Sequence, residues 1–315
     1  MRFTLRQLEY FIAAGETGSI TLASERIHIS PPSISTAISH LERELDAQLF
    51  VRHHAQGLSL TSAGRTLLGE AKRVVAQAEG LYTAASQASM SVRGSLSVGC
   101  MVTLAPMLLP ELVHSFTSAF PAVQVVHRDG HQQDLLQSLR RCETDVTLTY
   151  DLQVPDDIEF QPLVSLPPYL VVAETHELAS RQALSIQELA EEPLVLLDLP
   201  LSREYFLALF MKEGVTPRIV ARSAHQEVVR TMVANRYGYA LFNARPRSDV
   251  TLDGRRLTSI RLAGDHRPMT IGLATLRELS KSRLVDAFLG HCRAHISRSY
   301  IPGMIPPVAA DRVRV

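Results

Sequence analysis

The sequence lacks the features that mark several large classes of protein. Its three cysteines, Cys100, Cys142 and Cys292, are odd in number and lie far apart, without the spacing of a disulfide framework or a zinc site. We expect three buried thiols that act as small hydrophobic groups in a reducing cytoplasm. No apolar run approaches the roughly 20 residues that a membrane span needs. Arg2 and Arg6 lead into an amphipathic segment, so we expect no signal peptide and a cytoplasmic protein.

An excess of either charge is also missing. The 32 Lys and Arg residues balance the 32 Asp and Glu residues, and the formal net charge is +0. The chain is therefore not a basic nucleic-acid coat, and any DNA binding must come from a local arrangement of side chains. With 315 residues, 46% of them hydrophobic, the chain is long enough for two or three domains with a sizeable core.

Catalytic motifs are absent as well. The sequence has no G-x-S-x-G elbow, no phosphate-cradling loop and no metal-ligand spacing. His53 and His54 are neighbours on an expected strand, where adjacent side chains point to opposite faces, and further ligands are missing. We therefore expect no enzymatic activity, no cofactor and no bound metal.

Hydrophobic spacing in the first 45 residues predicts three helices. Apolar residues recur on one side of residues 5–16 and again of residues 20–27, where Ser19 can cap the second helix. A third helix follows Ser30, with Pro32 in its first turn, where a missing N–H group does no harm. Two short helices joined by a tight turn predict a helix-turn-helix.

The third helix presents short polar side chains, which suit a helix that enters the major groove. A serine-rich first turn is equally typical of a solvated helix cap, so this face alone leaves DNA binding open. Apolar runs at 49–51 and 58–60 then predict a two-stranded wing, with Arg52 at its base for a phosphate or minor-groove contact. The side chains expected to contact DNA are Thr21, Ser30, Pro32, Ser33, Ser35, Thr36, Ser39, His40, Arg52 and His53.

One long helix is predicted from residue 61 to about residue 89. Small and apolar residues recur in it at alternating steps of four and three, which is a heptad seam. Such a seam beside a DNA-binding unit favours a homodimer that reads two half-sites. The alternative is that the stripe packs against its own chain. The seam residues are Leu67, Ala71, Val74, Ala78, Leu81, Ala85 and Ala88.

Residues 95–297 alternate strand and helix signals. The first part reads as βαβαβ, which predicts a parallel sheet with helices on both faces. Helices are expected at 104–120 and 133–141. Strands are expected at 96–100, 123–126, 145–149, 169–173, 194–197, 219–222, 239–242 and 269–274.

Ligands of open α/β sheets bind beyond the carboxyl ends of the strands. Thr103 lies there at a helix start, where its hydroxyl and backbone N–H groups can hold a carboxylate, although simple N-capping is the alternative. Arg203 and Arg245 can pair with an anionic ligand or lie solvated at the surface. The expected effector-binding residues are Met101, Val102, Thr103, Tyr150, Ser202, Arg203, His225, Asn243 and Arg245, and the expected effector is a small organic anion.

A longer pattern spans the first 68 residues without a break in spacing. Its members are Leu5-Arg6-Gln7-Leu8-Glu9-Tyr10-Phe11, Gly18-Ser19-Ile20-Thr21, Ala23, Ile27-His28-Ile29-Ser30, Pro32-Ser33-Ile34-Ser35, Ile38, Leu41-Glu42, Leu45, Leu49-Phe50, Arg52, Leu60-Thr61 and Ala63-Gly64. This pattern resembles the DNA-binding domain of LysR-type transcriptional regulators. Gly99, Thr103, Leu108-Leu109-Pro110 and Gly238 are similar to positions of that family's effector domain.

The resemblance implies a domain plan. A winged helix-turn-helix is expected at 1–60 and a linker helix for dimerisation at 61–92. An effector domain of two Rossmann-like lobes, similar to periplasmic binding proteins, is expected at 93–297. Lobe I would hold about 95–164 and 267–297, and lobe II about 165–266, with two crossing strands as the hinge. Residues 298–315 are expected to be a disordered tail. Family members are usually homotetramers that bind promoter DNA and change its bending when an inducer binds.

The chain departs from the family pattern in three places. Pro31, Thr36 and Ala37 stand where family members often carry Gln, Arg and Gln on the recognition helix. Long base-reading side chains are thus missing, which predicts greater reliance on backbone contacts and DNA shape. Cys142 stands where a Gly is common. Lobe II has no cysteine, so the cysteine pair of the peroxide-sensing branch has no counterpart and we discount redox sensing, including through Cys100 with Cys142.

Two other classes of function compete with a regulator. A transport-type solute-binding protein shares the two-lobed fold, but it would need an export signal and would not need residues 1–90. An enzyme built on the lobes would need a nucleophile and a base brought together, and the sequence shows no such pair.

Overall fold

A computed structural model describes residues 3–53, 57–86 and 92–307, although the side chains of His53 and of residues 79–86 lie outside this description. The chain forms two compact units. Unit 1 contains residues 1–91, 137–144 and 279–283, and unit 2 contains residues 92–136, 145–278 and 284–315. None of the helices in the described part has the length and apolar character that a membrane crossing requires.

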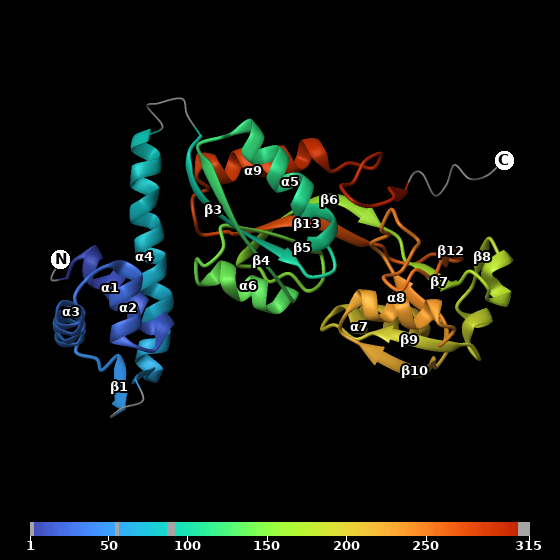
Figure 1. Cartoon of the computed structure of the whole chain (residues 1–315), viewed down its shortest axis with the longest axis horizontal. Coiled ribbons are helices and arrows are strands. Elements are labelled where there is room, and N and C mark those ends of the chain that lie inside the picture. The colour runs from blue at the N-terminus through green and yellow to red at the C-terminus, as the bar shows by residue number, and fades with distance from the viewer. Residues whose placement is uncertain (1–2, 54–56, 87–91, 308–315) are drawn as a thin grey trace. The chain divides into compact units, whose positions relative to one another are not determined.

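Unit 1 is a winged helix-turn-helix followed by a long helix (Figure 1). Its core closes around side chains such as Phe11 and Ile34, and the ring of Phe11 packs edge-on against Phe50 at 5.6 Å. The predicted helices and two-stranded wing are confirmed, while the wing tip at 54–56 lies outside the described residues. The elements are α1 (Leu5–Thr17), α2 (Ile20–Ile27), α3 (Pro31–Glu44), the antiparallel strands β1 (Phe50–His53) and β2 (Gly57–Leu60), and α4 (Ser62–Ser86).

The seam of α4 divides into two parts. Leu67 and Ala71 pack against the core of unit 1. These two seam residues therefore contact their own chain rather than a second helix of a dimer. Val74 is 40% exposed and is available to another helix. The side chains of Leu81 and Ala85, and the whole of Ala88, lie outside the described residues.

Unit 2 contains two lobes, and lobe I is built on a five-stranded sheet of order β4-β3-β5-β13-β6. Strand β3 is parallel to β4 and β5, so the parallel arrangement predicted from the βαβαβ pattern is confirmed. Strand β13, which lies beyond that pattern, is antiparallel to β5 and β6. Helices α5 and α9 cover one face and α6 the other (Figure 1). The elements are β3 (Gly94–Met101), α5 (Ala105–Ala119), β4 (Val123–Gly130), α6 (Gln132–Arg140), β5 (Val146–Tyr150), β6 (Ile158–Leu166), β13 (Met269–Leu276) and α9 (Arg283–His295).

Lobe II holds a four-stranded sheet, β11-β7-β12-β8, and the parallel pair β10-β9. Backbone pairing between Leu194 and Tyr239 joins the two. Gly238 makes this junction possible: its φ is +149°, and a Cβ atom there would lie 1.9 Å from the carbonyl oxygen of Pro193. The elements are β7 (Tyr169–Ala173), η1 (Glu177–Ser180), β8 (Ala183–Leu184), η2 (Gln187–Leu189), β9 (Pro193–Leu197), α7 (Ser202–Lys212), β10 (Arg218–Ser223), α8 (Gln226–Ala234), β11 (Ala240–Phe242) and β12 (Leu257–Leu262).

The chain crosses between the lobes twice, after β6 and after β12. The two crossings run side by side, because Leu166 at the end of β6 pairs with Met269 at the start of β13. The segment that follows α9 is ordered, since Ile301 and Met304 are fully buried. For residues 298–307 the expected disordered tail is therefore wrong, because the burial of Ile301 and Met304 outweighs a composition rich in proline and small residues. Residues 308–315 lie outside the described residues.

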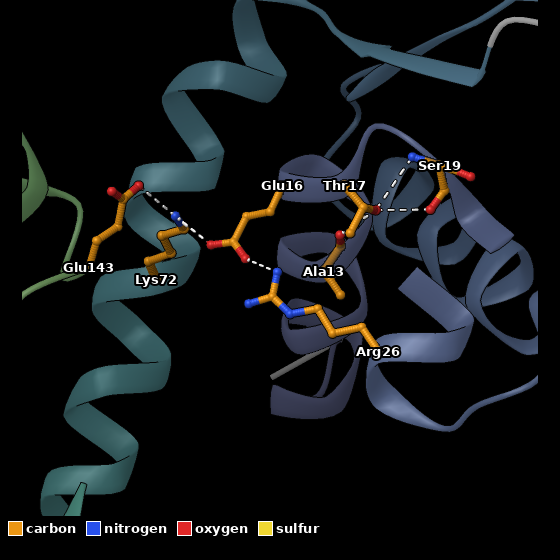
Figure 2. Close-up of polar contacts among 7 residues, drawn as sticks. All are labelled: Ala13, Glu16, Thr17, Ser19, Arg26, Lys72 and Glu143. Carbon is orange, nitrogen blue, oxygen red and sulfur yellow. Dashed lines mark hydrogen bonds and ion pairs between the residues drawn. The ribbon is translucent and has the colours of Figure 1, made fainter. Parts of the chain in front are cut away.

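An ion-pair cluster joins α1, α2, α4 and the bend at Glu143 within unit 1 (Figure 2). The ammonium group of Lys72, only 8% exposed, lies 2.8 Å from Glu16 Oε1 and 2.9 Å from Glu143 Oε1. Arg26 from α2 also binds Glu16, at 2.6 Å. Two carboxylates thus neutralise a buried cation, the arrangement that a charge in a weakly polar environment requires. Burial raises the pKa of Glu16, but Lys72 and Arg26 outweigh it, and the net pKa lies below the ordinary value of 4.5.

This cluster predicts a pH-dependent contribution to stability. Because the pKa of Glu16 is lower in the folded than in the unfolded chain, its stabilisation is complete above pH 4.5 and is lost as the pH falls through the folded pKa. The melting temperatures of the wild type and of Glu16→Gln can be measured by calorimetry across the acid range. The difference between them should be constant above that pH and shrink below it. A difference that is independent of pH, or that grows on acidification, would contradict the assignment.

Two glycines of α4 predict opposite effects of the same substitution. A Cβ atom at Gly64 would lie 2.1 Å from the carbonyl oxygen of Leu49, whereas one at Gly69 would meet open space. Gly64→Ala should destabilise unit 1 by about 1–3 kcal/mol through overpacking. Gly69→Ala should stabilise α4 by about 0.5–1 kcal/mol through helix propensity. Hydrogen exchange of the α4 amides measures both, and equal effects of the two changes would show that the close approach at Gly64 is absent.

Candidate DNA interface and effector cavity

The predicted DNA-contacting residues gather on α3 and its surroundings. Thr21, Ser30, Pro32, Ser33 and Thr36 are exposed, and Ser35, Ser39 and His40 are partly exposed. The hydroxyls of Ser30 and Ser33 hydrogen-bond to each other at 2.8 Å in the first turn of α3. His40 Nδ1 lies 3.2 Å from Gln7 Nε2, so this ring is oriented by α1. The face is short and polar, as a helix in the major groove requires.

Arg52 is tied to the same face. Its guanidinium group donates to Ser35 Oγ at 3.2 Å and to Ser39 Oγ at 3.3 Å, so the base of the wing is held against α3. A guanidinium carries five N–H donors, and this arrangement uses two of them on serine hydroxyls. The group can therefore position a phosphate beside α3 while it remains exposed. His53 lies in β1, but its side chain is outside the described residues.

A cavity lies in unit 2 where the strands of both lobes end. Tyr150, Leu197 and Phe242 are the last residues of β5, β9 and β11, and Ser202 and Gln226 are the first residues of α7 and α8. This is where open α/β sheets bind ligands. Its accessible volume is about 10 Å³, close to the smallest that holds one water molecule. The lining residues are Thr103, Tyr150, Leu197, Ser202, Phe206, Gln226, Phe242, Asn243, Ala244 and Met269.

The cavity brings together four of the nine expected effector-binding residues: Thr103, Tyr150, Ser202 and Asn243. Gln226 also lines the cavity. The sequence places it just before an expected helix, beside His225, but the expected effector-binding residue of that segment is His225 and not Gln226. The apolar lining residues carried no separate signal, because apolar residues at strand ends are found throughout the chain.

The other expected effector-binding residues lie elsewhere. The guanidinium group of Arg203 donates to Asp198 at 2.9 Å and to Glu204 at 2.8 Å, so these two carboxylates hold the side chain. Arg245 lies 3.7 Å from Asp249. These carboxylates compete for the two guanidinium groups, and neither arginine is among the residues that line the cavity.

The remaining three expected effector-binding residues, His225, Met101 and Val102, also lie outside the cavity lining. His225 is exposed and precedes α8, one position before the lining residue Gln226. Met101 points into the core and is 1% exposed. Val102 lies in the turn after β3 and lines a separate groove of about 690 Å³ between α5 and the edge strand β4.

Two hydroxyls meet at the lobe I side of the cavity. The oxygen atoms of Thr103 and Tyr150 lie 3.5 Å apart. Burial raises the pKa of Tyr150 well above its usual value, so its hydroxyl stays protonated and can donate. Thr103 lies just before α5, whose N-terminal end carries partial positive charge. Both features favour an anionic or acceptor group at this side.

Asn243 provides an acceptor on the opposite side. Its Nδ2 donates to the carbonyl oxygen of Leu166 at 2.8 Å and to the hydroxyl oxygen of Tyr205 at 3.2 Å. The hydroxyl of Tyr205 in turn donates to the carbonyl oxygen of Arg267 at 2.6 Å. Asn243 is 6% exposed, and its Oδ1 atom has no hydrogen-bond partner in the structure. A buried acceptor without a partner is costly, so an N–H or O–H donor that reaches this atom would be bound favourably.

The cysteines do not form a reactive pair. Burial raises the pKa of the Cys292 thiol to about 12 and that of Cys100 well above its usual range, which suppresses the reactive thiolate. Cys142 has φ +53°, the left-handed conformation that glycine adopts most easily, and this explains why glycine is favoured at that turn. Within the described part of the chain, no group of three or more His, Cys, Asp or Glu side chains is placed to hold a metal ion.

Comparison with known proteins identifies both units. Residues 5–65 match the bacterial regulatory helix-turn-helix protein of the lysR family, and residues 90–297 match the LysR substrate binding domain. The crystal structure of HinK, a LysR family transcriptional regulator from Pseudomonas aeruginosa, is 34% identical. It covers 94% of this chain and 99% of its own, with a TM-score of 0.65.

Two further relatives agree with this assignment. The dual regulator OxyR of Escherichia coli is 28% identical over 241 residues, which is 76% of this chain and 79% of its own. Full-length CbnR, solved in complex with its target DNA, is 22% identical and covers 93% of this chain and 99% of its own. Its TM-score of 0.62 shows the shared fold. The chain belongs to the LysR family of DNA-binding transcriptional regulators, with a winged helix-turn-helix and a ligand-binding domain.

Proposed function

We propose that this regulator binds promoter DNA as a dimer of dimers and senses a small organic anion in the cavity of unit 2. One observation carries the effector proposal: Thr103, Ser202 and Gln226 bring the N-terminal ends of α5, α7 and α8 to one cavity. Helix N-termini favour negative charge and present N–H groups to it. A regulator that binds promoters acts where the chromosome is, so we place it in the cytoplasm.

The DNA part of the proposal is supported by unit 1. The polar face of α3 and the tethered Arg52 give one surface for phosphates and base edges. CbnR, which shares the fold, was solved with its target DNA bound. The exposed side chain of Val74 on α4 supports self-association, because the earlier seam residues are occupied by the core of unit 1. Neither rival class, a transport-type binding protein or an enzyme, needs the DNA-binding domain at 5–65.

Shape-dependent DNA recognition predicts different results for two kinds of variant. Ser33→Ala and Thr36→Ala should change base preference by less than about 1 kcal/mol at any position, since their short side chains read few base edges. Arg52→Ala should weaken all sequences similarly and reduce the slope of log affinity against log salt by about 1. Binding is measured on operator variants of a duplex selected from random DNA by the full-length protein. A dominant base contact from Ser33 or Thr36 would contradict shape recognition.

An effector in the cavity predicts a stability change that depends on Thr103. A carboxylate at a hundredfold excess over its dissociation constant should stabilise the protein by about 2.7 kcal/mol. Thermal unfolding against a library of small carboxylates should find one, and Thr103→Val should abolish the shift. Thr275→Val is the matched control, because Thr275 is also buried, at 3% exposed against 7% for Thr103, but lies outside the cavity lining. A shift that Thr103→Val leaves intact would place the effector elsewhere, and no shift by any carboxylate would overturn the anionic effector.

A further inference from the structure

None of the side chains that line the cavity carries a charge. Five of its lining residues are polar but neutral, namely Thr103, Tyr150, Ser202, Gln226 and Asn243, and the other five are apolar. An anion would therefore meet hydroxyl groups and helix ends rather than a guanidinium or ammonium group. Helix ends provide partial charges of about half a unit each and fixed N–H directions, so they favour a small carboxylate in a defined orientation.

The orientation of the Asn243 amide is fixed by its partners. The carbonyl oxygen of Leu166 can only accept, so it must face the amide nitrogen. The hydroxyl proton of Tyr205 is used on the carbonyl oxygen of Arg267, so that hydroxyl also accepts from Asn243. A flipped amide would bring two acceptors together at 2.8 Å. Asn243 Oδ1 is therefore an acceptor that needs an N–H or O–H donor.

The group that donates to Asn243 Oδ1 must also be compatible with the charge around the cavity. An ammonium group would supply N–H bonds, but the lining contains no carboxylate and three helices direct their positive ends at the cavity. A neutral hydroxyl or ring N–H satisfies Asn243 without this repulsion. Hydrocarbon between the two polar groups can contact Phe206 and Phe242.

We infer that the effector is a small carboxylate that also carries an uncharged hydrogen-bond donor, received by Asn243 Oδ1. This inference rests on the proposed anionic effector and narrows its chemical class. The carboxylate lies toward Thr103 and the helix ends, and the donor lies toward Asn243. A ligand with only the carboxylate leaves Oδ1 buried without a partner, and the site rejects it on that ground.

Matched pairs of acids test the inference on the full-length protein. Glycolate and acetate, lactate and propionate, and mandelate and phenylacetate differ by one hydroxyl, and alanine replaces the hydroxyl of lactate with an ammonium group. Calorimetric titration should show that the hydroxyl member of at least one pair binds about 10-fold or more tightly than its partner. Alanine should bind more weakly than lactate.

Two variants connect the preference to the amide. Asn243→Leu should reduce the preference for the hydroxyl member to about onefold, while Tyr205→Phe should keep it, because Leu166 still orients the amide. If Asn243→Leu fails to fold, the matched pairs on the wild type still decide. Equal binding within every pair, or tighter binding of alanine, would overturn this inference but leave the anionic effector standing. No binding by any of the six acids would overturn this inference, and the anionic effector is overturned only if no carboxylate of the thermal-unfolding library binds either.

Discussion

The hydrogen bond from Asn243 Nδ2 to the carbonyl oxygen of Leu166 ties the end of β11 in lobe II to the strand that leaves lobe I. It fixes an amide at the place where the chain crosses between lobes, and it leaves Oδ1 as an acceptor without a partner. The cavity beside it admits little more than one water molecule. A larger effector must therefore part the lobes, and the paired crossings at Leu166 and Met269 are the segments that must bend.

Unit 1 meets a different constraint, because the chain as a whole carries no excess positive charge. Hydrogen bonds and ion pairs instead position single charged side chains, namely Arg52 and Lys72. Arg52 is fixed over the serines of α3, which keeps a cation beside the recognition helix, and the buried Lys72 is neutralised by two carboxylates. A DNA-binding surface built this way depends on the placement of single groups, so its affinity is sensitive to the loss of one arginine rather than to overall charge.

Much of the fold could be predicted from the sequence, because its elements are determined locally. Ser19 caps α2 and the repeating apolar residues of α1–α3 set the helix boundaries. Strands β6, β8 and β12 and helix α9 were missed, and the antiparallel position of β13 could not be read from a βαβαβ pattern that stops at β5. In the site, Thr103 and Asn243 followed from strand ends, but Arg203 and Arg245 did not reach the cavity. Their acidic partners are set by tertiary contacts, which spacing along the chain does not reveal.

A ligand that binds in the cavity of unit 2 should change how tightly unit 1 binds DNA. The direct test is to titrate the tightest-binding carboxylate into the protein and measure its affinity for a selected operator duplex, for the wild type and for Thr103→Val. We expect the DNA affinity of the wild type to change by about 5- to 150-fold, the ligand affinity to change by the same factor when DNA is bound, and the variant to show no change. A ligand that leaves the DNA affinity of the wild type unchanged, or that alters it equally in both proteins, would show that the cavity does not control DNA binding.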